Sequence, residues 1–411
     1  MNPLELTLGI MTAVGGFVDI SELVFAAQAG SLFGYALMWV FLLGTIGMGV
    51  FGEMSGRVAA IAKQPVFNLM RHRLGLKLGL VTLMGSLLST LITCAAEVGG
   101  MGLILHYLTG APYLLMATVS TVALFASMWV LPFKWIERTY GMLGLLMITF
   151  AVGLVAIHPP WAKVAAGLVP QVPHGLSSAQ QLTFAYFSVA ILSAVLFPYE
   201  SYFYSSGGIE EQWGAKDLLT NRITCTVGFG LGSLLALSIL ASSAQLFGPV
   251  LVGPQVPGTT AIQAAIPFGR PGLILALLGM LFAVAGAAVE TCMSNAYAVA
   301  QFFGWEWGRH KKPWEAPRFT IAWIVVLALA LLIVLTGVDV MRLVEFAVLF
   351  SIVVLPLTYL PLMLLANDKS YMGQYANKWL ANGLGWLFFL VVSAAAIAAI
   401  PLYLLTSGGQ A

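Results

Sequence analysis

The stretch LFPYESYFYSSG, residues 196–207, places a proline and a carboxylate inside a long apolar segment. Pro198 has no backbone N–H and clashes with the preceding helical turn, so a helix that reaches this point must break. Glu200 follows two residues later. An ionisable side chain beside a helix break in an apolar segment is typical of a functional site inside a membrane.

The apolar character extends over the whole chain. Of its 411 residues, 60% are hydrophobic and only 8% are Asp, Glu, Lys or Arg, whereas a soluble domain carries about 25% charged residues. This composition excludes a soluble globule. The near balance of 18 Lys and Arg against 16 Asp and Glu also argues against a nucleic-acid partner, which requires a clustered basic surface. We therefore expect an all-α polytopic membrane protein whose surroundings are the lipid bilayer.

Eleven stretches are long and apolar enough to span a bilayer, which takes about 20 residues. They form one transmembrane domain over residues 1–411, joined by short connections, of which the Pro-rich loops 158–178 and 248–270 are the longest. The predicted spans are 5–28, 32–58, 79–108, 112–133, 138–157, 181–206, 219–247, 271–303, 318–336, 341–366 and 381–406.

The positions of the basic residues predict the orientation in the membrane. With a cytoplasmic N-terminus, fifteen of the 18 Lys and Arg lie on the cytoplasmic side, and only Lys163, Arg270 and Arg342 lie outside. Because cytoplasmic loops carry an excess of Lys and Arg, we expect the N-terminus inside and the C-terminus outside. We expect the protein in a prokaryotic inner (plasma) membrane. No feature of the sequence favours a particular oligomeric state.

Several acids fall inside the predicted spans without a basic residue at comparable depth. Asp19, Glu22, Glu97, Glu200 and Glu290 lie in the middle of spans one, three, six and eight. A charge at the bilayer centre costs at least ~2.5–3.5 kcal/mol, so either these carboxyls are protonated or a bound cation compensates them. For Glu290 alone, a protonated packing residue is an equally good interpretation. Together the acids favour handling of a cation or a proton.

A second break is predicted in the first span, in GGFVDISEL at residues 15–23, where two glycines and β-branched residues weaken the helix. Breaks in spans one and six, five helices apart, are typical of inverted-repeat transporters, in which unwound segments meet at the membrane midplane. The two repeats would cover about 5–157 and about 181–366, with an extra helix at about 381–406.

Both broken segments resemble motifs of the NRAMP family of divalent-metal transporters. DISELVFAAQAGSLFGYALMW, residues 19–39, resembles the family's Asp-Pro-Gly-Asn motif and its following Gly-Tyr-x-Leu-x-Trp, and residues 196–206 resemble its Met-Pro-His segment. The resemblance implies a LeuT-like (APC) fold. It also implies a metal site at Asp19, Glu22 and the backbone carbonyl of Ala194, which Glu200 would approach from the opposing repeat.

The departures from the family motifs have a chemical direction. Phe197 stands in place of the metal-binding methionine and Tyr199 in place of the histidine, while Glu22 replaces the asparagine. Losing a soft thioether and gaining a carboxylate favours a hard ion such as Mg²⁺ or Mn²⁺. The family's proton-pathway aspartate falls on Cys94, whereas the glutamate one turn later is kept as Glu97, so the sequence argues against proton coupling.

Four residues are predicted to lie around the metal site or along a proton path: Glu97, Tyr199, Phe197 and Glu290. For Tyr199, a hydrogen bond to Glu22 or Glu200 and a packing role are equally good interpretations. We expect no cofactor other than the transported metal ion.

The sequence favours a secondary transporter that moves a divalent cation by alternating access. The alternative is an organic-solute transporter of the same fold, in which an acid near the break binds the ammonium group of an amine or amino acid, helped by Phe197 and Tyr199. We do not expect an enzyme, because the sequence shows no intramembrane His pair, Gly-x-Ser-x-Gly or Asp pair, and no phosphate loop for ATP.

Overall fold

A computed structural model of the chain describes residues 18–250 and 257–409. Within these ranges ten helices are long and apolar enough to cross a membrane, and a shorter apolar helix, Ile20–Phe33, precedes them. The predicted count of about eleven spans agrees with this, although residues 5–17 of the first predicted span, with Gly15 and Gly16, lie outside the described residues.

The described elements are helical throughout. The α-helices are α2 (Ile20–Phe33), α3 (Met38–Ala62), α4 (Val66–Thr109), α5 (Tyr113–Val130), α6 (Phe133–Gly144), α7 (Ile148–Ala156), α8 (Trp161–Gly167), α9 (Ser178–Val195), α10 (Pro198–Glu210), α11 (Leu218–Leu246), α12 (Pro257–Phe303), α13 (Pro317–Leu335), α14 (Val340–Asn367), α15 (Lys369–Met372) and α16 (Trp379–Thr406). Short 3-10 turns lie at Leu145–Met147, Ala215–Asp217, Gly248–Val250 and Gly373–Tyr375.

Two glycines explain where the predicted boundaries were wrong. The second span was predicted from residue 32, but α2 continues to Phe33 and the chain turns at Gly34, whose φ is 59°, so α3 begins at Met38. The predicted loop 248–270 is helical from Pro257 onward, and α12 changes direction at Gly269, with a φ of 64°. Positive φ favours glycine because it carries no Cβ.

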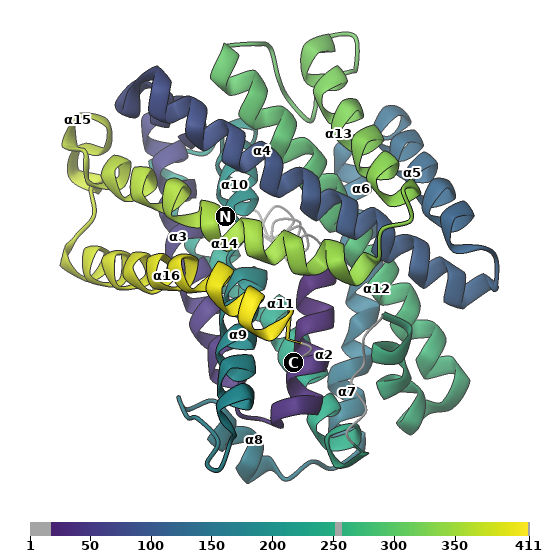
Figure 1. The fold of residues 1–411 in the computed structure, drawn as a ribbon. Helices are drawn as coiled ribbons and strands as arrows, with labels where there is room; N and C mark the ends of the chain where they lie inside the picture. Colours follow the sequence, from purple (N-terminus) through teal and green to yellow (C-terminus); the bar gives the residue numbers. More distant parts are fainter. Residues whose placement is uncertain (1–17, 251–256, 410–411) are drawn as a thin grey trace.

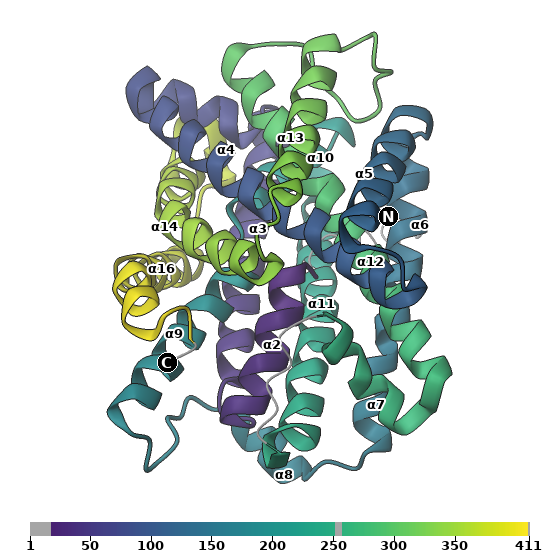
Figure 2. The ribbon, with the colours of Figure 1, turned by 45° about the vertical axis from the view of Figure 1, so that its right-hand side comes forward.

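The helices that carry the intramembrane acids pack in the interior. The long α4 crosses the molecule in Figure 1 and packs against α12 and α14. The short α2 runs beside α11 (Figure 2). A Cβ added at Gly30 of α2 would lie 2.2 Å from the carbonyl oxygen of Leu240, so this close approach of the two helices requires glycine. The second half of α2 is thereby held against α11.

Candidate functional site

The break predicted at Pro198 separates α9 from α10. Helix α9 ends at Val195, Phe197 is extended (φ −73°, ψ 138°), and Pro198 is the first residue of α10. In a continuous helix the carbonyl of Ala194 would accept a hydrogen bond from the N–H of residue 198, which proline lacks. The carbonyl of Ala194, a residue only 1% exposed, is therefore available to a ligand.

The described part of the first span begins at a second helix start. Asp19 is extended (φ −97°, ψ 177°) and caps α2, with its Oδ1 accepting a 2.8 Å hydrogen bond from the backbone N–H of Glu22. Its Oδ2 and both carboxylate oxygens of Glu22 are buried and meet no hydrogen-bond donor among the described residues. A helix N-terminus stabilises negative charge, and both Asp19 and Glu22 lie at this helix start.

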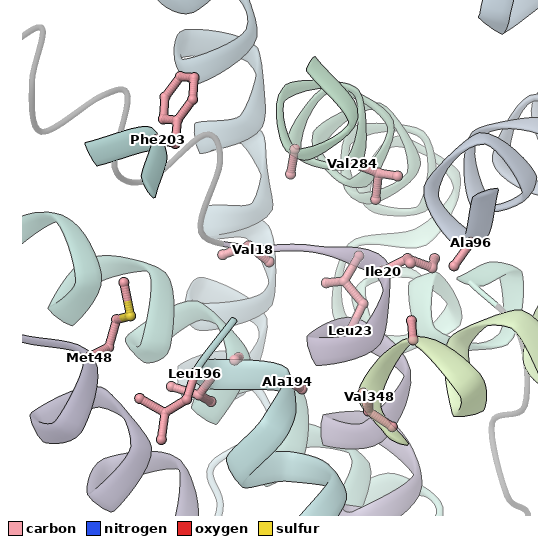
Figure 3. Packing of buried hydrophobic residues seen from close by; sticks show 14 of the residues in the cluster. Val18, Ile20, Leu23, Met48, Ala96, Ala194, Leu196, Phe203, Val284 and Val348 are labelled. Carbon is pink, nitrogen blue, oxygen red and sulfur yellow. The ribbon is translucent and has the colours of Figure 1, made fainter. Parts of the chain in front are cut away.

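Helix α4 packs directly against this first turn. Figure 3 shows Ile20 pointing toward Ala96 of α4, and a Cβ added at Gly100 would lie 2.8 Å from Cδ1 of Ile20. Glu97 is the next residue along α4, is fully buried, and has two carboxylate oxygens without a donor in the described part of the chain. The packing at Ile20 thus brings Glu97 close to the start of α2.

The acids of four helices form one group. Glu200 lies in the first turn of α10; its carboxyl and that of Asp19 interact electrostatically with both Glu22 and Glu97. Glu290 of α12 interacts with Glu97 and Glu200. We call these five residues the acid cluster. All are at most 6% exposed, so the fold places in the interior all five acids that the sequence places in the middle of the spans.

The acid cluster does not by itself form a closed metal cage. Within residues 18–250 and 257–409, no three His, Cys, Asp or Glu side chains are grouped tightly enough to hold a metal ion. Because one oxygen of Asp19 is used as a helix cap, backbone carbonyls and water would have to supply part of any coordination shell.

The two aromatic residues of the break pack against each other. The rings of Phe197 and Tyr199 lie 5.3 Å apart, centroid to centroid, and the hydroxyl of Tyr199 meets no hydrogen-bond partner among the described residues. It therefore makes no hydrogen bond to Glu22 or Glu200, and the packing interpretation of Tyr199 is the one that the structure supports.

Ser294 of α12 anchors the first turn of α10, directly after the break. Its hydroxyl donates a 2.9 Å hydrogen bond to the carbonyl of Tyr199. Ser294 lies one helical turn after Glu290, so α12 contributes both an acid and an anchor. The sequence predicts such an interhelical hydrogen bond, because a hydroxyl in an apolar helix finds a partner on a neighbouring helix.

A buried ion-pair network lies at the far end of α10. Arg309, in the loop after α12, lies 3.0 Å from the carboxylate of Glu210 and 2.9 Å from that of Glu211, and its guanidinium lies 4.8 Å from the ring centroid of Phe133. A hydrogen bond to His310, together with the charge of Arg309, lowers the pKa of Glu211 to about 2. The sequence shows only a loop rich in basic and aromatic residues, with no sign of these pairs.

Comparison with known proteins identifies the family. Residues 9–401 match the profile of the Nramp family, described as natural resistance-associated macrophage protein-like. The chain belongs to the Nramp family. The divalent metal cation transporter MntH 1 of Pseudomonas aeruginosa is 28% identical over 400 residues, covering 94% of this chain and 89% of that protein. The MntH transporter of Deinococcus radiodurans is 24% identical over 395 residues, covering 92% and 85%.

Solved structures show the same fold. A variant of the Eremococcus coleocola manganese transporter superimposes with a TM-score of 0.73 at 17% identity, covering 96% of this Nramp chain and 85% of that one. The transporter MhsT in complex with L-phenylalanine gives a TM-score of 0.62 at 16% identity, covering 97% and 98%. These similarities confirm the LeuT-like fold. With ten apolar helices in the described residues and bacterial relatives, the protein is an integral protein of the plasma membrane.

Proposed function

We propose that this Nramp protein carries a divalent metal cation across the membrane by alternating access. The ion binds between the start of α2 and the α9–α10 break, where the candidate ligands are Asp19, Glu22, Glu200 and the carbonyl of Ala194. Because no three acidic side chains in the described residues are grouped tightly enough to hold an ion together, water completes its coordination shell. The observation that carries the proposal is the buried, unpartnered state of the carboxylate oxygens of Glu22, on which the carboxyls of Asp19 and Glu200 also act. Buried carboxylates need a compensating charge, and a divalent cation provides it.

The donor set favours a hard ion. Phe197 occupies the position of the family's methionine and packs on Tyr199. The methionine sulfur is therefore missing as a ligand, and the proposed ligands are all oxygens. Oxygen ligands suit Mg²⁺ and Mn²⁺. Since no three acidic side chains of the described residues are grouped tightly enough to hold an ion directly, the site also suits an ion that keeps several waters, as Mg²⁺ does.

We expect metal movement to proceed without an obligatory proton gradient. The position of the family's proton-pathway aspartate is Cys94, whose sulfur lies 3.3 Å from the sulfur of Cys292. Glu97 remains one turn away as a carboxyl of the acid cluster, where it contributes negative charge to the site.

Uptake into proteoliposomes tests the proposal. Vesicles that contain a metal-sensitive dye should report influx of Mn²⁺ and Mg²⁺ with the wild type and strongly reduced influx with Glu22→Gln and Asp19→Ala. Glu306→Gln is the matched control, because that carboxylate is 75% exposed in the loop after α12, and its flux should equal that of the wild type.

Two results would count against the proposal. Unchanged metal flux in both site variants would remove the assigned ligands. Thermal stabilisation by amines or amino acids, with none by Mn²⁺ or Mg²⁺, would favour the organic-solute alternative.

A further inference from the structure

Two thiols from distant parts of the chain meet in the membrane interior. Cys94 on α4 and Cys292 on α12 are both completely buried, and their sulfurs lie 3.3 Å apart. The two residues are 198 positions apart in sequence and come together because α4 and α12 pack along each other. In a disulfide the S–S distance is about 2.05 Å, so an approach of roughly 1.2 Å would join them.

We propose that Cys94 and Cys292 form a redox-active dithiol that closes to an intramolecular disulfide. With an organic disulfide as oxidant, the thiolate of one cysteine attacks it, forms a mixed disulfide and releases one thiol. The thiolate of the second cysteine then attacks the protein sulfur of the mixed disulfide and releases the second thiol. Two thiol protons leave the protein, the cysteines are oxidised, and the organic disulfide is reduced to two thiols.

The third cysteine has different surroundings and serves as an internal control. Cys225 on α11 is equally buried, but its sulfur lies 3.8 Å from the side-chain oxygen of Asn221. A mixed disulfide formed there would have no neighbouring thiol to resolve it. The three cysteines therefore differ in the product that they form, not only in the rate at which they react.

The link would act on the acid cluster. Cys94 precedes Glu97 by one helical turn on α4, and Cys292 follows Glu290 by two residues on α12. A disulfide would fix these two helices to each other beside both acids. This part of the inference rests on the proposed function: oxidation should slow metal uptake, and a thiol reductant should restore it.

The test uses the full chain in detergent and in proteoliposomes, with 4,4′-dithiodipyridine as the probe. This small aromatic disulfide releases a chromophoric thiopyridone at each exchange. We expect a Cys94–Cys292 linked peptide whose mass is lower by two hydrogens than the sum of its two reduced peptides, and no retained pyridyl group on either residue. Cys94→Ser and Cys292→Ser should each retain one pyridyl group on the remaining partner, while Cys225→Ser should form the link as the wild type does.

The outcomes separate the two parts of the inference. Pyridyl groups retained on both Cys94 and Cys292, or no reaction at either, would overturn the dithiol assignment, and mass spectrometry reads this without any transport. If the link forms, a several-fold, reductant-reversible loss of Mn²⁺ flux that is absent from the double variant Cys94→Ser/Cys292→Ser supports the effect on transport. Unchanged Mn²⁺ flux in the linked protein overturns that effect. If the reduced protein also shows no Mn²⁺ flux, the proposed function is wrong, and the dithiol assignment still stands on the mass spectrometry.

Discussion

Replacing Pro198 by alanine should improve the helix and damage the site. Alanine at position 198 supplies the N–H donor that the carbonyl of Ala194 lacks, and it removes the restriction that proline places on the preceding Phe197. One backbone hydrogen bond contributes about 0.5–1.5 kcal/mol. Because the same carbonyl is a proposed metal ligand, capturing it in a helical bond should weaken metal binding by a similar free energy, roughly two- to tenfold in Kd.

The assay pairs metal titration with thermal unfolding in detergent. Pro198→Ala should bind Mn²⁺ more weakly and unfold at the same or a higher temperature than the wild type, since proline at the first position of a helix is replaced at little cost. Pro401→Ala is the control, because Pro401 lies inside α16 on an exposed face; it should raise stability and leave binding unchanged. Unaltered Mn²⁺ affinity in Pro198→Ala would refute the role of the Ala194 carbonyl. A lower unfolding temperature would show that any loss of affinity comes from destabilisation of the fold.

Three other results are expected. Arg309→Met should destabilise the protein by about 3–5 kcal/mol, because it leaves the buried carboxylate of Glu210 unpaired. Arg222→Met, at a side chain 64% exposed, should cost less than about 1 kcal/mol, and equal unfolding temperatures of the two variants would contradict this. The pKa of Glu211 is held at about 2, below its usual 4.5, so its contribution to stability is present above pH 4.5 and is lost as the pH falls toward 2; Glu211→Gln should flatten the unfolding temperature over that window, and an unchanged pH profile would refute the pairing. Ser294→Ala should reduce metal uptake, because it removes the hydrogen bond that anchors α10 directly after the α9–α10 break. Ser393→Ala, which removes a hydrogen bond to Phe389 of the same helix α16, should not reduce uptake. Equal uptake by the two variants would show that the anchor is dispensable.

The sequence predicted the helix break because its cause is local. Pro198 removes a donor whatever surrounds it, and the structure places the interruption at Leu196 and Phe197. The span boundaries were less accurate at Gly34 and Gly269, because a turn of positive φ inside an apolar stretch leaves hydropathy unchanged.

The contacts between distant helices could not be predicted from the sequence. The proximity of Cys94 to Cys292 depends on the register of α4 against α12, and a pattern within either helix does not contain that register. Arg309 illustrates the same limit. Its loop has the composition of a membrane-surface anchor, yet the fold buries the guanidinium against Glu210.

The sequence predicted which acidic residues lie in the membrane interior, but not the positions of their carboxylate oxygens. Glu22 stands out in the sequence as an acid without a basic neighbour at its depth. The backbone N–H of Glu22 donates a hydrogen bond to Oδ1 of Asp19, which removes that oxygen from the set of metal ligands. This bond follows only from the helix start at Ile20, which the sequence does not specify.

Isothermal titration of the purified protein with Mn²⁺, Mg²⁺ and Cd²⁺ tests the central claim most directly. We expect the wild type to bind Mn²⁺ and Mg²⁺, Glu22→Gln to lose about tenfold or more in affinity, equivalent to about 1.4 kcal/mol, and Glu306→Gln to match the wild type. Cd²⁺, a softer ion, should bind more weakly than Mn²⁺. Equal Mn²⁺ affinity in Glu22→Gln and wild type, or tighter binding of Cd²⁺ than of Mn²⁺, would contradict an oxygen-only site for a hard divalent ion built on the acid cluster.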